Sequence, residues 1–369
     1  MLILIKMKHR TKQAPKDVYA WCCDYEDYRG EGRLARCFVE YVVKKNYNKF
    51  YIKTPYYFRE INNQNIHNNK IKTKKEINLN YFDKYIAPFI GIFWLWKNFL
   101  LRRKIAYINF NPLWNIFVFI LSPPRTIFGP ITGSIYDGNV RNINQFIRAY
   151  LFPFLYKISI FFLEIRKTKL LFSTSLLKTV LSKKIINNSI FDFQIIYYNQ
   201  IIKKSHLVRS GNKNIDLIFY NRQHDQKKNL TILKMLKLIS NHKQYKNIVI
   251  GNNLPLKNFL NVKIIEHSKV MFLLSKSKYT FFSPENHLSM FLLEALSRNV
   301  KIFIDNKYRR ITNYFASSNF IFLDFSNEQK LLKKIIFHLN LNFKIKKTKL
   351  KKNIKKNLNN KIDYYLKEF

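Results

Sequence analysis

Three cations gather in one short loop in the second half of the chain. The apolar run 215–220 (IDLIFY) predicts a strand and residues 230–240 predict a helix, with Arg222, Lys227 and Lys228 between them. Guanidinium and ammonium groups beside a helix N-terminus can clamp a diphosphate through charge-assisted hydrogen bonds. The alternative is a solvated basic loop in a chain that is rich in lysine throughout.

Two carboxylates follow a later strand, which we expect at residues 279–282. Glu285 precedes a helix expected at 288–298, and Glu294 falls in the middle of that helix among apolar side chains. A carboxylate in apolar company is costly unless it has a partner. Ribose hydroxyls are suitable partners for Glu294, and a basic neighbour is the alternative.

The start of the same helix offers a third group. Its first backbone N–H groups have no partner within the helix, so the backbone around His287, Leu288 and Ser289 is a candidate anion site. The imidazole of His287 has the alternative of being an ordinary loop histidine.

Glycine is scarce, and its placement is informative. Five of the 8 glycines fall in two loops of the first half, each expected after a strand: Gly30, Gly32, Gly129, Gly133 and Gly138. Glycine serves where backbone must approach a ligand closely, and parallel α/β sheets bind ligands at the carboxyl ends of their strands. Simple turn chemistry is the alternative for each loop.

Strands alternate with helices along most of the chain, which predicts parallel sheets covered on both faces. We expect domains at residues 1–200 and 201–342, and a lysine-rich tail at 343–369. Apolar residues recur every four positions in the tail, at Leu350, Ile354, Leu358, Ile362 and Leu366. This spacing predicts an amphipathic helix docked on the body, with membrane contact or a frayed end as alternatives.

The order of these groups resembles the donor domain of the retaining GT-B glycosyltransferases. The resemblance rests on Asn221-Arg222 followed by Lys228-Asn229, and on the segment 283–297 (SPENHLSMFLLEALS) with its Glu-Ala near the end. It implies an α/β fold of the GT-B type, in which two Rossmann-like domains with parallel sheets face each other across a cleft.

The resemblance also implies roles for the residues. Arg222 and Lys228, with Lys227 beside them, would bind the donor diphosphate, and Glu294 would hold ribose hydroxyls. Glu285 and the backbone at His287, Leu288 and Ser289 would face the donor sugar, and the acceptor side of the cleft would be lined by Gly30, Gly32, Gly129 and Gly133. No metal and no cofactor is implied.

The sequence departs from the family pattern at three points. Eight residues separate Glu285 from Glu294 where the family has seven, and the usual glycines of the sugar-facing loop are absent. There is no histidine between His67 and His206, so the N-terminal histidine that contacts the sugar in the family has no counterpart.

Charge alone points to other partners. The chain carries 66 Lys and Arg against 22 Asp and Glu, a formal net charge of +44, which would suit a polyanion such as nucleic acid or an anionic membrane. A compositional bias is the favoured explanation for much of this charge, because Lys is abundant together with Asn, Ile, Phe and Tyr, all of which have A/T-rich codons. The basic residues are spread along the whole chain, whereas nucleic-acid readers more often concentrate them, so nucleic acid is the less favoured partner.

Membrane contact is favoured by one aromatic segment. Trp94 and Trp96 precede Lys97 and Arg102, a pattern typical of an interfacial anchor, although an ordinary core helix with a basic end fits as well. The apolar runs at 85–96 and 105–124 are too short or too polar to predict a membrane-spanning helix. The cysteines include no CxxC spacing, which indicates a reducing compartment without a zinc site.

Together these features predict a cytoplasmic glycosyltransferase, peripheral on the inner face of the cytoplasmic membrane. It would move a sugar from a nucleotide-sugar donor, with retention, to a hydroxyl of a lipid-linked glycan such as lipopolysaccharide or O-antigen. The alternatives are a nucleic-acid-binding protein driven by charge and a sugar-nucleotide epimerase of similar architecture.

Overall fold

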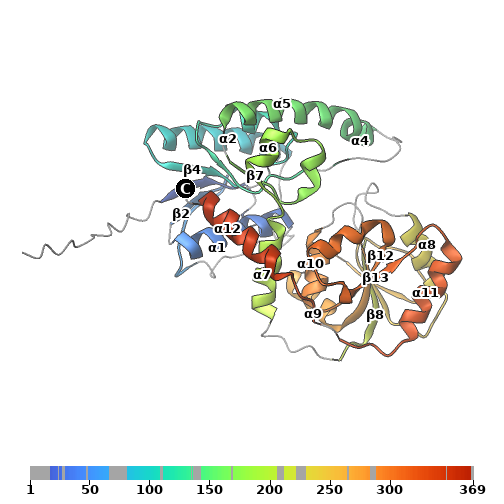
Figure 1. Ribbon diagram of the computed structural model, residues 1–369. Helices are drawn as coiled ribbons and strands as arrows, with labels where there is room; N and C mark the ends of the chain where they lie inside the picture. Colours follow the sequence, from blue (N-terminus) through green and yellow to red (C-terminus); the bar gives the residue numbers. More distant parts are fainter. Residues whose placement is uncertain are drawn as a thin grey trace, which may run out of the picture.

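The chain forms two α/β domains, each built around its own sheet (Figure 1). The computed structural model describes residues 17–23, 25–26, 30–46, 49–65, 81–108, 111–133, 135, 143–167, 169–205, 212–221, 230–263, 266–282, 288–345 and 347–366. The predicted α/β class with two Rossmann-like domains and parallel sheets is confirmed.

The N-terminal sheet has the order β3-β2-β1-β4-β5. Its strands are β1 (Val18–Trp21), β2 (Phe50–Lys53), β3 (Phe58–Ile61), β4 (Lys104–Tyr107) and β5 (Ile127–Phe128). β1 is central and pairs in parallel with β2 and β4, while β3 runs antiparallel to β2 at the edge. Residues 54–57 form a turn that folds the chain back onto β2 and so places β3 beside it.

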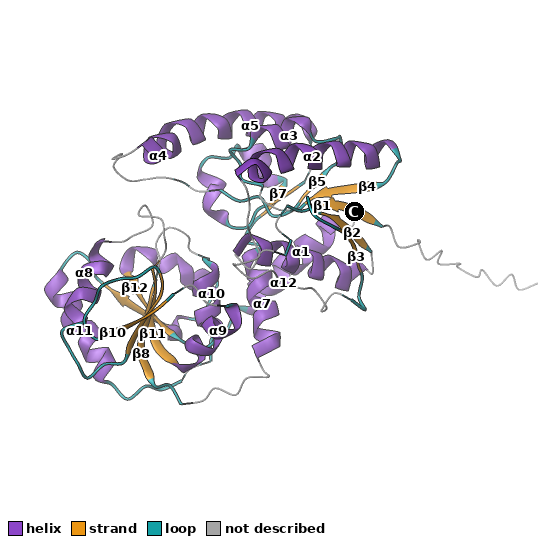
Figure 2. Ribbon diagram, turned by 180° about the vertical axis from the view of Figure 1, so that it is seen from behind, coloured by secondary structure: helices purple, strands orange, loops and turns teal. Residues whose placement is uncertain are grey.

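Helices cover both faces of this sheet. One side carries α1 (Gly30–Asn46) and α7 (Gln194–Ser205), and the other carries α2 (Tyr81–Leu100), α3 (Ile116–Leu121) and α5 (Phe152–Arg166) (Figures 1 and 2). Shorter elements complete the domain: α4 (Ile143–Phe146), the π-helical turn η1 (Ile147–Leu151), β6 (Leu170–Leu171), the 3-10 turn η2 (Ser175–Thr179), α6 (Lys183–Asn187) and β7 (Ser189–Ile190).

The helical segment before residue 167 is interrupted near Pro153. Proline lacks the N–H that would continue the α-helical hydrogen-bond ladder, and here the π-helical turn η1 stands directly before α5, with Pro153 in the first turn of α5. None of the described helices is both long and apolar enough to cross a membrane.

The C-terminal sheet is parallel throughout, in the doubly wound order β10-β9-β8-β11-β12-β13. Its strands are β8 (Ile215–Asn221), β9 (Asn247–Gly251), β10 (Phe259–Val262), β11 (Ser277–Phe281), β12 (Lys301–Asp305) and β13 (Phe320–Leu323). Its helices are α8 (Leu230–Ile239), α9 (His267–Lys276), α10 (Met290–Ser297) and α11 (Glu328–Asn340), with 3-10 turns η4 (Asn306–Asn313) and η5 (Ser317–Asn319). The edge strand β10 begins at Phe259, whose side chain is buried.

The tail returns to the first domain. Helix α12 (Lys352–Leu366) packs against α1 and β7, and the Tyr365 hydroxyl donates a 2.9 Å hydrogen bond to the carbonyl oxygen of Phe128. Leu358, Ile362 and Tyr365 are buried there. The docked amphipathic helix is thus the correct alternative for the described part of the tail, and the domain limits at 200 and 342 stay a prediction.

Helix α2 approaches the sheet at one glycine. A Cβ atom at Gly91 would overlap the indole ring of Trp21, which is fully buried in β1. The absence of a side chain at Gly91 therefore sets how closely α2 lies on the sheet.

We expect Gly91→Ala to destabilise the protein by about 1–3 kcal/mol, because the buried indole cannot move aside without displacing the helix. Ile90→Ala on the exposed side of α2 is the matched control and should change the stability by about 0.5 kcal/mol or less. Urea unfolding of the two variants measures the difference, and equal stability would contradict the close-packing argument.

Candidate functional site

Helix α10 carries a charge into the interior. It is an apolar helix buried along Leu292–Leu296, and Glu294 in its middle is only 3% exposed. A carboxylate so placed must find hydrogen-bond donors, since an unpaired buried charge costs several kcal/mol.

Three donors from three different helices meet the Glu294 carboxylate. The Tyr197 hydroxyl of α7 donates a 2.7 Å hydrogen bond to Oε1, and Nε2 of His267, the first residue of α9, lies 3.0 Å from the same oxygen. Nη1 of Arg33 on α1 forms an ion pair with Oε1 as well. One oxygen therefore joins the N-terminal domain to the C-terminal domain.

These contacts keep Glu294 ionised. Burial acts to raise its pKa, but the charge of Arg33 and the hydrogen bond from His267 outweigh it, and the pKa lies below the ordinary value of 4.5. Burial acts to lower the pKa of Arg33, yet the charge of Glu294 leaves that pKa raised. Burial and the adjacent carboxylate hold the pKa of Tyr197 well above 10, so its hydroxyl stays a neutral donor.

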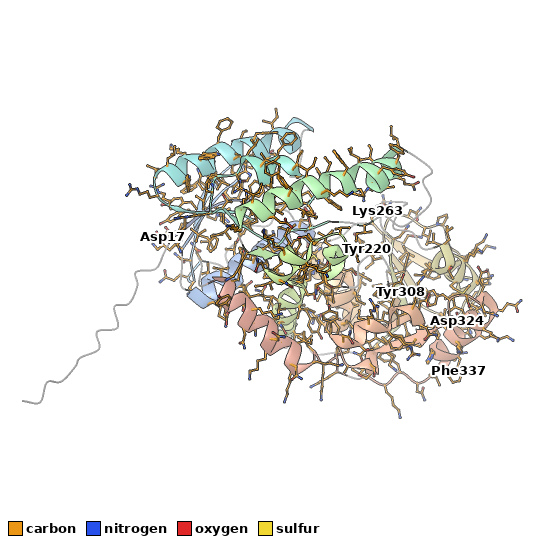
Figure 3. The ribbon with its side chains drawn as sticks, turned by 45° about the horizontal axis from the view of Figure 1, so that its top comes forward. Asp17, Tyr220, Lys263, Tyr308, Asp324 and Phe337 are labelled. Atoms are coloured by element: carbon orange, nitrogen blue, oxygen red, sulfur yellow. The ribbon has the colours of Figure 1, made fainter. Side chains whose placement is uncertain are left out.

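The starts of α1 and α10 face each other beside this cluster. A Cβ atom on Gly30 would lie 3.0 Å from Sδ of Met290, so the two helices approach closely there. Tyr220, near the carboxyl end of β8, stacks on Phe291 with ring centroids 5.3 Å apart and interacts electrostatically with Arg33. Figure 3 shows Tyr220 where the C-terminal sheet faces the N-terminal domain.

The structure describes three of the eight residues expected at the donor side: Leu288, Ser289 and Glu294. Leu288 and Ser289 are buried directly before α10, and the Ser289 hydroxyl caps the helix by accepting a 3.3 Å hydrogen bond from the Leu292 amide. Five expected residues lie outside the described part of the chain: Arg222, Lys227, Lys228, Glu285 and His287. The elements that flank them, β8, α8, β11 and α10, are described, and α10 carries Glu294 itself.

The glycines have structural roles that differ from the expectation in part. Gly30 and Gly32 lie in the first turn of α1 and not in the preceding loop, since the helix begins at Gly30. Gly129 and Gly133 do follow β5, where added side chains would meet the backbone of Ile108 and the side chain of Leu177. Both therefore allow close packing inside the N-terminal domain, and their place on an acceptor side stays a prediction.

The sequence analysis allowed Glu294 a basic neighbour, and Arg33 is one, but it identified none of the three partner residues. Arg33 had a usable signal, because it follows Gly30 and Gly32 in the first glycine-containing segment. His267 stands where a helix begins after a strand, which is a position that binds ligands in parallel sheets. The sequence around Tyr197 contains no feature that would indicate its role, because Tyr197 reaches Glu294 only through the packing of α7 between the domains. Among the described residues, no group of three or more His, Cys, Asp or Glu is placed to hold a metal ion.

Comparison with known proteins defines the fold. No protein-family model matches the chain, and neither does any curated protein. Sucrose-phosphate synthase from Thermosynechococcus elongatus is similar with a TM-score of 0.50 and 8% identity, over 88% of this chain and 90% of that one. This likeness, with the two Rossmann-like domains described above, shows that the chain has the GT-B fold.

Two further structures are more distant by TM-score. An alpha-glucosyltransferase in complex with UDP and a 13-mer DNA has a TM-score of 0.47 at 9% identity, covering 96% of this chain and 95% of its own. The S. aureus MnaA–UDP structure has a TM-score of 0.46 at 11% identity, covering 88% of each chain.

We expect Arg33→Met to lower the free energy of unfolding by about 2–3 kcal/mol, because it leaves the Glu294 charge buried without its counter-ion. Adding Glu294→Gln should restore part of that loss, since the double variant no longer buries a charge. The control is Lys234→Met in the exposed Lys234–Glu328 pair, where the change should be about 0.5 kcal/mol or less. Losses that simply add in the double variant would show that the two side chains are not coupled.

The pH dependence of stability should also reveal the ionised, paired state of Glu294. Because the pKa of Glu294 is lowered in the folded protein, its ionised form stabilises the fold above its unfolded pKa and loses that contribution as the pH falls below about 4.5. Melting temperatures measured from neutral pH downward should therefore fall more steeply for the wild type than for Glu294→Gln. Parallel curves for the two proteins would be incompatible with an ionised, paired Glu294.

Proposed function

We propose that this chain is a glycosyltransferase that moves a sugar from a nucleotide-sugar donor to a hydroxyl of a glycan acceptor, with retention. The single observation that supports it most is the buried, ionised Glu294, which lies where the starts of α1 and α10 face each other in a GT-B fold. Ligands of doubly wound sheets bind at the carboxyl ends of the strands, which is where β8 delivers Tyr220 beside Arg33.

In this proposal Glu294 binds the donor ribose. A carboxylate accepts about four hydrogen bonds, and Arg33, Tyr197 and His267 all meet Oε1. We assign the second oxygen, Oε2, to the ribose hydroxyls. Arg33, Tyr197 and His267 would then act as positioning residues that fix the carboxylate in place and keep it ionised.

The leaving diphosphate needs positive charge. Arg222 and Lys228, with Lys227, would supply it from the segment between β8 and α8, and the backbone before α10 at His287, Leu288 and Ser289 would add N–H donors. Glu285 would face the donor sugar. By the family resemblance, these groups would offset the developing charge without a metal ion or a cofactor.

The acceptor in this proposal is a lipid-linked glycan, such as lipopolysaccharide or O-antigen. Gly30, Gly32, Gly129 and Gly133 would lie on the acceptor side. The protein would act in the cytoplasm, peripherally on the inner face of the cytoplasmic membrane, where its charge of +44 favours an anionic leaflet.

A thermal-shift screen against nucleoside diphosphates and nucleotide sugars tests the donor site. We expect at least one of them to raise the melting temperature of the wild type, since a ligand that binds only the folded state stabilises it. Arg222→Ala with Lys228→Ala should abolish that shift. Arg310→Ala with Lys333→Ala removes the same charge from exposed positions and should keep it.

Three outcomes would count against the proposal. If no nucleotide ligand raises the melting temperature, the proposed donor site is contradicted. Conversion of the nucleotide sugar in the absence of any acceptor would favour a sugar-nucleotide epimerase. Binding to generic duplex DNA that is equally strong in both double variants, with no nucleotide binding, would favour a nucleic-acid-binding protein.

A further inference from the structure

The outer helices of the N-terminal domain form one layer. Helix α2 packs on β1 and β4, and α3 packs against both α2 and α5, so the three helices lie side by side on this side of the sheet (Figures 1 and 2). We call their outward surface the helical face.

The outward side chains of this layer are apolar. On α2 the exposed positions follow one helical stripe: Phe89 (39% exposed), Phe93 (77%), Trp96 (38%) and Leu100 (74%). Phe117 on α3 and Phe154, Phe161 and Ile165 on α5 are each more than half exposed. The solvent side of a surface helix is normally polar, and a contiguous exposed apolar patch marks an interaction surface.

Specific contacts hold the three helices together as a unit. The rings of Phe89 and Phe117 lie 5.8 Å apart between α2 and α3, and the Trp96 indole donates a 2.8 Å hydrogen bond to the carbonyl oxygen of Leu121. Arg166 at the end of α5 donates to the carbonyl oxygens of Phe119 and Pro123, at 2.7 and 2.9 Å. The helical face is therefore continuous from α2 across α3 to α5.

Cations flank the helical face and acids are scarce along it. Six of the described basic residues on or next to these helices are exposed: Lys97, Arg102, Arg103, Arg125, Lys157 and Lys167. Between Asp83 and Glu164 the sequence contains a single acid, Asp137, and Glu164 itself accepts a hydrogen bond from Ser182. Apolar and aromatic side chains with a cationic margin match the acyl boundary and headgroups of an anionic bilayer.

We propose that the helical face docks on the surface of an anionic lipid bilayer. The helices would lie in the interface with Phe93 and Phe161 inserted at the acyl boundary, and the flanking cations at the phosphate level. A second copy of the chain fits this surface less well, because it would bring two cationic margins together. The inference rests on the proposed function in one respect: docking gives a donor-binding enzyme access to an acceptor held in the same bilayer.

Vesicle sedimentation with the full chain tests the docking. The wild type should bind vesicles of phosphatidylglycerol mixed with phosphatidylcholine, and should bind pure phosphatidylcholine at least roughly tenfold more weakly, since each cation near an anionic surface contributes about fivefold. Phe93→Ser with Phe161→Ser should weaken binding to the mixed vesicles by roughly tenfold or more, because two exposed rings no longer enter the acyl region.

The matched control is Phe272→Ser with Phe337→Ser. These rings are 58% and 61% exposed on α9 and α11 of the C-terminal domain, and Figure 3 shows Phe337 on the far side of the molecule from α5. This variant should bind mixed vesicles like the wild type. Equal losses in both double variants, or no loss in the first, would overturn the assignment of the helical face.

Two further readouts separate the remaining explanations. If size-exclusion chromatography shows a dimer that the Phe93 and Phe161 substitutions dissociate, the face is a self-association surface and the lipid proposal fails. In the variant with Phe93→Ser and Phe161→Ser, nucleotide should raise the melting temperature as much as in the wild type. If the wild type binds vesicles but no nucleotide raises its melting temperature, the transferase proposal alone is contradicted. If a nucleotide raises the melting temperature but the wild type does not bind vesicles, the docking proposal alone is contradicted.

Discussion

One buried negative charge links the two domains. Glu294 stands in an apolar helix, and the donors that offset its burial come from α1, α7 and α9. No single domain supplies them all, so the carboxylate is satisfied only when the domains meet as they do here. A hydrophobic contact tolerates small shifts, but hydrogen bonds to a buried ion weaken quickly with distance and angle. This cluster therefore fixes the relative position of α1 and α10 more sharply than the surrounding apolar packing does.

The sequence predicted the fold class well because hydrophobic periodicity is a local property. Strands of the C-terminal sheet were recognised from the runs 215–220 and 279–282. Local sequence patterns failed where an element depends on contacts with residues that are distant in the sequence. β3 exists because β2 offers it an edge, and α1 begins at Gly30, not several residues later.

The candidate site could likewise be predicted only in part from the sequence. Glu294 could be found because a lone carboxylate among apolar residues is conspicuous in any sequence. Its partners could not, since Arg33, Tyr197 and His267 are separated from it by 261, 97 and 27 positions and become neighbours only through domain packing. The helical face was anticipated in part from Trp94 and Trp96, but exposure, not composition, distinguishes its residues: Phe93 is open to solvent while Leu95 is fully buried.

The return of α12 to the first domain has a mechanical consequence. The chain runs from the N-terminal domain to the C-terminal domain after α7 and comes back before α12, where Tyr365 bonds to Phe128. Two domains joined by a single chain segment could rotate relative to each other about any axis. Two separate connecting segments restrict that rotation mainly to the axis that passes through both of them. Any relative rotation of the two domains would therefore be restricted mainly to that axis, and the contacts of Glu294 with Arg33 and Tyr197 would oppose it.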